Sequence, residues 1–223
     1  MDGSPLLTES RTMNVLNELR RARFIAIARR VPRDKVVPCA EALVQAGVTF
    51  LEVTFDPSDP ETLADTAEKV RLVRNAFPAL HTGCGTVLTP EMAEAAADAG
   101  AEYCVAPNTK AAVIERAHAC GLLAFPGAFT PCEIANAYDL GADAVKIFPV
   151  QHGEEAYVRN VMSPLSHIPF LLTGGVNPAT IRAMLATGAL AVAAGASILR
   201  PDLVAAADYG AIAALAKQHL ENM

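Results

Sequence analysis

Lys146 is the residue whose surroundings most strongly suggest chemistry. The chain has five lysines, and four fall in predicted loops or helices, whereas Lys146 interrupts the apolar run AVKIFPV. A buried ammonium group without a partner is costly, and burial lowers the pKa of a lysine so that its neutral amine can attack a carbonyl carbon. The sequence therefore predicts a lysine that forms a Schiff base, with a structural lysine–carboxylate pair as the alternative.

Glu52 places a carboxylate inside a second apolar run, FLEVTF. If Glu52 and Lys146 point into the same interior, the carboxylate can transfer protons during imine formation and to or from a substrate hydroxyl. The alternative is that Glu52 only neutralises Lys146 or Arg29. The two interpretations are compatible.

Further residues are suited to an anionic substrate. Arg29 ends the run FIAIAR, and its planar guanidinium can hold a carboxylate through two hydrogen bonds, whereas Arg30 is interpreted as an ordinary surface residue. Glycine-bearing turns end the last two runs, where barrels commonly build a phosphate site from backbone N–H groups and a helix N-terminus. These turns contribute the predicted substrate-binding residues Thr173, Gly174, Gly175, Gly195 and Ser197.

The segment GCGTVL, residues 83–88, superficially suggests a dinucleotide-binding loop. It lacks the third glycine and the first βαβ unit that such a loop requires, so we reject that interpretation. We expect its glycines to let the backbone approach a ligand, with the Thr86 hydroxyl available to that ligand. Pro107, which ends the run YCVAP, is assigned to the same substrate-binding group.

The histidines and cysteines do not indicate a metal site. The five histidines form no HxxxH pattern, and the five widely spaced cysteines form no CxxC pair. An odd number of cysteines also argues against a disulfide framework. We therefore expect no metal, no cofactor and a reducing, cytoplasmic compartment.

Eight short apolar runs separated by amphipathic segments must position these residues. The runs cover residues 24–29, 50–55, 81–88, 103–107, 122–129, 144–150, 170–176 and 191–197. Strand and helix alternate with no Pro/Gly/Ser-rich linker between them. This pattern predicts one (β/α)₈ TIM barrel domain over residues 1–223 in preference to an open doubly wound sheet.

Local signals predict where several helices begin. Thr89-Pro90, Thr130-Pro131 and Asn177-Pro178 each combine a favoured N-cap residue with proline at the first helical position, and Thr130 with Glu133 fits a capping box. The segment TESRTMNVLNELRRAR predicts an extra N-terminal helix that closes the bottom of the barrel. Residues 1–7 are expected to form a frayed terminus.

The composition excludes several classes of protein. With 52% hydrophobic and 19% charged residues, the chain can bury one large core and is too apolar to be disordered. A net charge of −6 gives no broad cationic field for nucleic acid or an anionic membrane. The first ten residues do not have the pattern of a secretory signal, and the apolar runs are too short to span a bilayer. The expected partner is a small molecule.

Five segments in order resemble the motifs of the 2-keto-3-deoxy-6-phosphogluconate (KDPG) and 4-hydroxy-2-oxoglutarate (KHG) aldolases. They are LVQAGVTFLEVTF, GCGTVLTPE, FPGAFTPCE, GADAVKIFP and LLTGGVNP, and the resemblance extends from Phe24 to Pro201. It implies a metal-free, homotrimeric class I aldolase that cleaves KDPG to pyruvate and D-glyceraldehyde 3-phosphate. It implies an imine at Lys146, acid–base catalysis by Glu52, and substrate contacts by Arg29, Thr86, Phe148, Gly174, Gly175 and Ser197.

Within that resemblance, Arg29 and Thr86 lie near the pyruvyl end, Phe148 walls the pocket, and the two glycines with Ser197 lie near phosphate. The chain departs from the family pattern in two places. Phe55-Asp56-Pro57 stands where some members carry an arginine, which leaves carboxylate recognition to Arg29. Ala196 replaces a glycine of many members, and its methyl group could crowd a phosphate oxygen.

Other functions fit the same residues. The imine chemistry would also suit KHG, 2-keto-3-deoxy-6-phosphogalactonate or the decarboxylation of oxaloacetate, and the sequence does not separate these substrates or the configuration at C4. A phosphosugar isomerase could use Glu52 as its base without a covalent intermediate. A phosphate-ligand-binding barrel would keep the Lys146–Glu52 pair as a structural feature only.

Overall fold

Short apolar strands build the centre of the protein, as seen in a computed structural model that describes residues 5–151 and 153–223, with side chains described from residue 12 except at residue 152. Within these residues, nine parallel strands form one sheet in the order β5-β4-β3-β2-β1-β9-β8-β7-β6. The strands are β1 Phe24–Ala28, β2 Phe50–Thr54, β3 His81–Gly85, β4 Tyr103–Val105, β5 Leu123–Phe125, β6 Gly127–Ala128, β7 Val145–Ile147, β8 Phe170–Thr173 and β9 Ala191–Ala194.

The two ends of this sheet come from one segment of the chain, so the sheet closes into a barrel. β5 and β6 are the two halves of the run predicted as one strand at 122–129, and Pro126 separates them. Proline has no N–H group to donate to a sheet, although its carbonyl still accepts a 2.8 Å hydrogen bond from the N–H of Lys146. The predicted (β/α)₈ TIM barrel is therefore confirmed, with its fifth strand divided.

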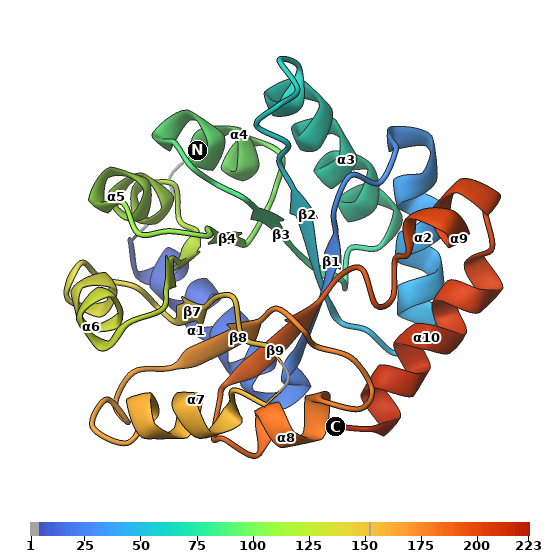
Figure 1. The fold of residues 1–223 in the computed structure, drawn as a ribbon. Helices are drawn as coiled ribbons and strands as arrows, with labels where there is room; N and C mark the ends of the chain where they lie inside the picture. Colours follow the sequence, from blue (N-terminus) through green and yellow to red (C-terminus); the bar gives the residue numbers. More distant parts are fainter. Residues whose placement is uncertain (1–4, 152) are drawn as a thin grey trace.

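Helices surround the strands (Figure 1). Their bounds are α1 Pro5–Ala22, α2 Arg33–Gln45, α3 Thr62–Ala76, α4 Pro90–Asp98, α5 Ala111–Ala119, α6 Pro131–Asp139, α7 Glu155–Met162, α8 Ile181–Leu185, α9 Pro201–Ala206 and α10 Tyr209–Glu221. No helix in the described part of the chain is long and apolar enough to cross a membrane.

The predicted helix starts are confirmed at two of the three sites. The Thr89 side chain accepts a hydrogen bond from the N–H of Met92, and Thr130 forms the complete capping box with Glu133. The prediction at Asn177-Pro178 is wrong, because α8 begins at Ile181. Asn177 instead begins a turn in which its side chain accepts a 2.8 Å hydrogen bond from the N–H of Ala179.

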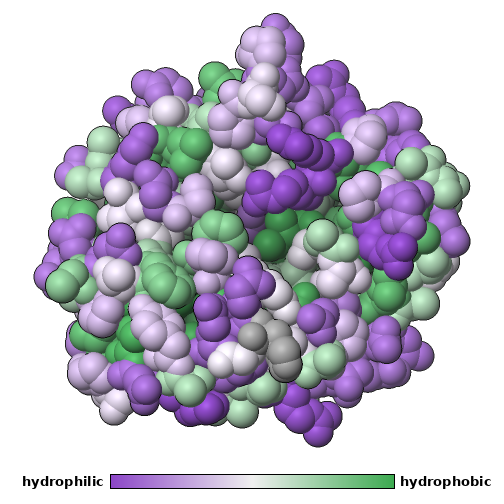
Figure 2. Space-filling view, in the orientation of Figure 1, coloured by the Kyte–Doolittle hydropathy of each residue, from purple (hydrophilic) through white to green (hydrophobic). Residues whose placement is uncertain are grey.

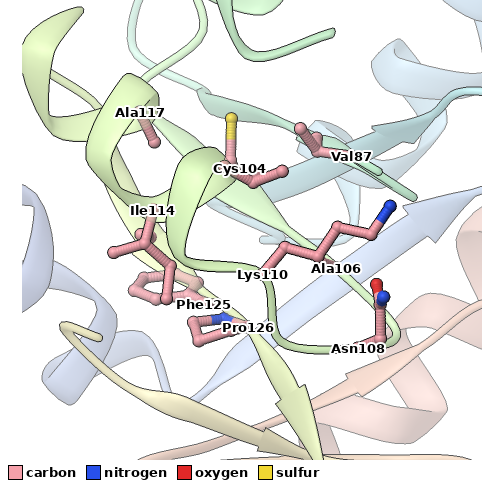
Figure 3. Close-up of a pocket in the computed structure, with 11 residues that line it drawn as sticks. Val87, Cys104, Ala106, Asn108, Lys110, Ile114, Ala117, Phe125 and Pro126 are labelled. Atoms are coloured by element: carbon pink, nitrogen blue, oxygen red, sulfur yellow. The ribbon is translucent and has the colours of Figure 1, made fainter. Parts of the chain in front are cut away.

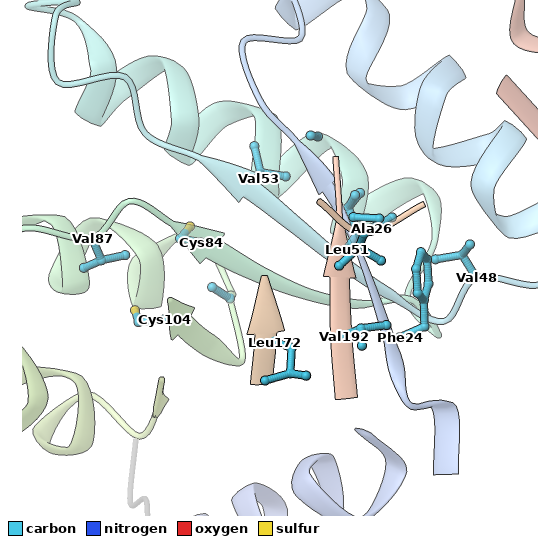
Figure 4. Close-up of a cluster of buried hydrophobic side chains, with 14 of the residues drawn as sticks. Phe24, Ala26, Val48, Leu51, Val53, Cys84, Val87, Cys104, Leu172 and Val192 are labelled. Atoms are coloured by element: carbon cyan, nitrogen blue, oxygen red, sulfur yellow. The ribbon is translucent and has the colours of Figure 1, made fainter. Parts of the chain in front are cut away.

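Strand alternation divides the buried apolar residues into two groups. One group lies between the strands and the surrounding helices, and Figure 4 shows ten of its labelled members, among them Val53, Cys84 and Cys104. The second group fills the barrel interior with Ile25, Ile27, Phe50, Tyr103, Val105, Leu123, Phe125, Ala144, Leu171, Ala191 and Ala193. Because side chains alternate along a strand, residues two positions further along point into the same interior.

The N-terminal helix closes one end of this interior. α1 runs behind the strands in Figure 1, and its residues Val15 and Leu19 belong to the interior group. Leu19 is fully buried and Val15 is 3% exposed. The predicted extra helix is therefore confirmed, and it begins at Pro5, inside the stretch expected to fray. Residues 1–4 of that stretch lie outside the described residues.

Leu19→Ala should destabilise the barrel because it opens a cavity at this closed end. We expect a loss of about 2–5 kcal/mol in the free energy of unfolding, measured by urea denaturation. Met13→Ala is the matched control, because Met13 lies on the same helix but is 58% exposed. Equal losses in the free energy of unfolding from the two substitutions would contradict the role of Leu19 in closing this end of the barrel.

Candidate active site

The predicted site residues cluster at the open end of the barrel. Residues that lie two or four positions after an interior side chain on the same run point toward the same side of the barrel wall. Eight of the predicted site residues have this spacing from an interior residue: Arg29, Glu52, Pro107, Lys146, Phe148, Thr173, Gly175 and Gly195. In (β/α)₈ enzymes, the carboxyl ends of the strands carry the chemistry. The barrel thus brings these residues from separate strands around one interior.

Lys146 lies on β7 in the middle of this interior. Its side chain is 3% exposed, and its Nζ lies 4.9 Å from the centroid of the Phe148 ring. In the described part of the chain, Nζ has no hydrogen bond and no carboxylate within 4.0 Å. Burial is the main cause that lowers the pKa of Lys146, the Arg29 charge lowers it further, and the Glu52 charge raises it. The arrangement favours a neutral amine able to attack a carbonyl.

Glu52 lies on β2 and is fully buried. Within the described residues, neither carboxylate oxygen has a hydrogen-bond partner. Burial raises the pKa of Glu52, and the charges of Lys146 and Arg29 act in the opposite direction. A buried carboxylate with no partner and a raised pKa is suited to accept and return a proton.

Two glycines of β3 make the inward position of Glu52 possible. A methyl group at Gly85 would overlap the Glu52 carboxylate, and one at Gly83 would overlap the Tyr103 ring. They leave space for side chains of the two neighbouring strands, β2 and β4. The expectation that these glycines let the backbone approach a ligand stays a prediction.

A cavity of about 490 Å³ opens at the mouth of the barrel. Its lining includes Arg29, Phe148, Thr173, Gly174, Gly175, Gly195 and Ser197, which brings seven of the predicted substrate-binding residues together. This volume lies within the usual range for small-molecule sites. Figure 2, in the orientation of Figure 1, shows hydrophilic atoms beside a hydrophobic patch near the middle of the face.

The two loops that follow β8 and β9 contain Gly174, Gly175 and Gly195, and we call them the glycine loops. They offer unused backbone N–H donors to this cavity. The N–H groups of Gly174, Gly175, Ala196 and Ser197 donate no hydrogen bond within the described chain. Gly174 and Gly175 have φ values of +104° and +58°, and a side chain at either position would crowd Val150. The expected helix N-termini are absent from this arrangement, because α8 begins only at Ile181 and α9 begins with Pro201, which has no N–H.

Ser197 lines the cavity, but its hydroxyl group is used inside the protein. Its Oγ donates a 2.9 Å hydrogen bond to the carbonyl of Val176 and lies 2.9 Å from Nε2 of the buried His219. Leu215 fixes the other side of that ring, because its carbonyl lies 2.7 Å from Nδ1. The Ser197 side chain therefore links two cavity loops to α10, and its N–H is the group left for a ligand.

Thr86 and Pro107 are placed less directly. Thr86 follows β3 with φ +59°, which is strained for a β-branched residue and is typical of functional positions. Pro107 lines an adjacent cavity of about 340 Å³, which shares Phe148 with the first. Neither residue lines the 490 Å³ cavity, so their roles as substrate-binding residues stay predictions.

The sequence interpretation missed two residues. Thr54 is 6% exposed on β2, two positions after Glu52, and its hydroxyl has no partner among the described residues. Its position after LEV in an apolar run was the available signal. Arg30 lines the cavity beside Arg29, although its sequence suggested only a surface residue.

A further small cavity lies outside the barrel interior, between β4, β5 and α5 (Figure 3). At about 10 Å³ it holds one water molecule at most. Lys110 and Asn108 point away from Ile114 and Ala117 in this view, and Lys110 Nζ donates to the carbonyl of Leu88. The cavity is therefore a packing gap. Across the described residues, no three His, Cys, Asp or Glu side chains are grouped as metal ligands.

Among the described residues, one buried lysine and one buried carboxylate lie below an arginine-lined mouth, and the protein is therefore a TIM barrel whose interior is suited to carbonyl chemistry. The sequence profile described as "KDPG and KHG aldolase" matches residues 15–215. The chain therefore belongs to the KDPG and KHG aldolase family, whose members are carbon–carbon lyases.

Individual relatives extend this comparison. The "KHG/KDPG aldolase" of Escherichia coli K12 is 30% identical over 190 residues, which cover 85% of this chain and 86% of the relative. A "Probable 2-dehydro-3-deoxy-6-phosphogalactonate aldolase" of Rhizobium meliloti is 31% identical, over 82% of this chain and 84% of the relative. The crystal structure of the 2-keto-3-deoxy-6-phosphogluconate aldolase of Zymomonas mobilis ZM4 with 3-phosphoglycerate superposes with a TM-score of 0.79 at 27% identity, over 93% of this chain and 95% of that chain.

Glu52→Gln should stabilise the protein at neutral pH, because it removes a charge that folding must bury. A raised carboxyl pKa in the folded state means that stability falls as pH rises above the unfolded value. We expect a gain of about 1 kcal/mol at pH 7 that disappears toward pH 4, measured by urea denaturation across this range.

Glu115→Gln is the matched control for the substitution itself, because Glu115 is exposed on α5. It should change the free energy of unfolding at pH 7 by less than about 0.5 kcal/mol. A Glu52→Gln variant with the same stability difference at pH 4 and pH 7 would show that Glu52 carries no buried charge.

Proposed function

We propose that this protein is a class I aldolase that cleaves KDPG to pyruvate and D-glyceraldehyde 3-phosphate through a Schiff base on Lys146. One observation carries the proposal: within the described chain, Lys146 is the only buried lysine and Glu52 the only buried carboxylate, and both point into one barrel interior. The family membership favours this lyase chemistry over the isomerase and over a binding barrel without turnover.

In the proposed reaction, the neutral amine of Lys146 attacks the C2 ketone, and protonated Glu52 gives its proton to the departing hydroxyl group. Water leaves, the iminium ion forms and Glu52 becomes a carboxylate. Glu52 removes the proton of the C4 hydroxyl, the C3–C4 bond breaks, and its electron pair moves into the iminium to form an enamine. The aldehyde leaves. Glu52 returns its proton to C3 of the enamine. Hydrolysis of the resulting iminium then releases pyruvate and the free amine of Lys146, and the proton set free in that step returns to Glu52.

Other residues would bind the two anionic ends of the substrate. The positive charge of Arg29 lowers the pKa of both Lys146 and Glu52, so its guanidinium is close enough to influence both groups. This position suits a contact with the substrate carboxylate next to C2. The unused N–H groups of the two glycine loops suit the terminal phosphate. Phe148 would wall the pocket above the lysine, and Thr86, Pro107 and Thr173 would complete it.

A second substrate is favoured by one comparison. The relative from Rhizobium meliloti is named for 2-dehydro-3-deoxy-6-phosphogalactonate, which differs from KDPG in configuration at C4. Relative cleavage rates of the two phosphorylated acids decide between them. The chemistry at Lys146 is the same for both.

Incubation with pyruvate and sodium borohydride should add a pyruvyl group irreversibly to Lys146. Intact mass and peptide mapping measure the adduct and its position. Lys146→Met should form no adduct and lose turnover, because no other lysine lies in the barrel interior of the described chain.

Lys217→Met is the matched control for this experiment, since Lys217 is an exposed residue of α10 paired with Glu221. It should retain both the adduct and the turnover. An unmodified Lys146 in the folded wild-type protein, or full turnover of Lys146→Met, would sink the imine mechanism.

We also propose a cytoplasmic homotrimer, in keeping with the resemblance to the family. Sedimentation equilibrium should give three times the chain mass of 23.4 kDa. A mass equal to one chain would contradict the trimer without affecting the proposed chemistry.

A further inference from the structure

The mouth cavity carries two adjacent cations. Arg29 and Arg30 both line it, whereas its lining contains no aspartate or glutamate. A cavity with positive side chains and unused N–H groups favours a ligand with more than one negative group. The proposed function already assigns Arg29 to the substrate carboxylate next to C2. It assigns no role to Arg30.

Arg30 is held at the outer rim by Asp56. Its Nε donates a 2.9 Å hydrogen bond to Oδ2 of Asp56. Asp56 is fixed in turn, because Oδ1 accepts hydrogen bonds from the N–H and hydroxyl of Ser58, and its own N–H donates to Thr62. The guanidinium is thus anchored by a rigid turn after β2.

The backbone separates the two arginines. Arg30 has φ +54°, a left-handed conformation that is uncommon for a residue other than glycine. The chain therefore turns between them. Arg29 acts on the buried charges of Glu52 and Lys146, whereas Arg30 faces Asp56 at the rim.

Arg30 keeps most of its binding capacity. Asp56 uses one N–H group of the guanidinium, which has five donors in all. The side chain is 72% exposed, so a ligand can reach the remaining donors. The glycine loops with their unused N–H groups line the same cavity.

We propose that Arg30, positioned by Asp56, binds the terminal phosphate of the aldehyde half of the substrate and so sets selectivity for phosphorylated aldehydes. This rests on the proposed aldolase function and adds a residue to its site. Asp56 acts as a positioning residue for Arg30.

The test compares two aldehydes that differ only in their phosphate group. Addition of pyruvate to D-glyceraldehyde 3-phosphate and to D-glyceraldehyde is measured for each variant. Arg30→Gln should lower kcat/KM for the phosphorylated aldehyde about tenfold, mainly through KM, because a charged hydrogen bond is lost. The value for D-glyceraldehyde should change less than about twofold.

Arg33→Gln is the matched control. Arg33 forms a similar exposed ion pair, 2.9 Å from Asp65, but lies on α2 and does not line the cavity. Its ratio of the two kcat/KM values should equal that of the wild type. Asp56→Asn should lower the ratio in the same direction as Arg30→Gln but less, and an unchanged ratio would refute the positioning role.

Equal losses with both aldehydes, or no loss with either, in Arg30→Gln would overturn the role of Arg30. The pyruvate–borohydride adduct on Lys146 separates this failure from a failure of the proposed function. An adduct in wild type and in Arg30→Gln, with unchanged selectivity, rejects only the role of Arg30. Absence of the adduct from the wild type rejects the aldolase mechanism itself.

Discussion

The two-residue alternation of side chains in a closed barrel is the constraint on which the site depends. Once Phe50 and Ala144 pack into the interior, Glu52 and Lys146 must point into it as well. Closure then removes both groups from water, and burial shifts both pKa values toward the uncharged forms. The same packing that builds the core thus prepares an amine and a carboxyl group for proton transfer.

This preparation opposes stability, because Lys146 and Glu52 fill interior positions with groups that form no ion pair in the described chain. The rest of the barrel offsets that cost. Apolar residues line both faces of the strands, and α1 covers the end that carries no chemistry. The unused donors stay at the mouth, where water or substrate reaches them. Stability and reactivity therefore occupy opposite ends of the barrel.

The fold could be predicted because its signals are local. Apolar runs mark strands, and a Thr-Pro pair marks a helix start through the geometry of two neighbouring residues. The features that the sequence did not reveal depend on partners distant in sequence. Gly85 makes room for Glu52, 33 positions earlier in the numbering, and Arg30 meets Asp56 only because β1 and β2 are neighbours. A single sequence without the barrel register does not reveal such pairs.

The closure of one end of the barrel by Val15 and Leu19 has a kinetic consequence. Because these side chains fill the end behind Lys146, substrate and products must enter and leave through the same open end of the barrel. In the proposed reaction the three-carbon enamine stays attached to the buried Lys146, and the aldehyde lies between the enamine and the open end of the barrel. The aldehyde must depart first, and in the synthetic direction pyruvate must enter before it. The closed end of the barrel therefore imposes an ordered release of the two products and an ordered binding of the two substrates in the reverse direction.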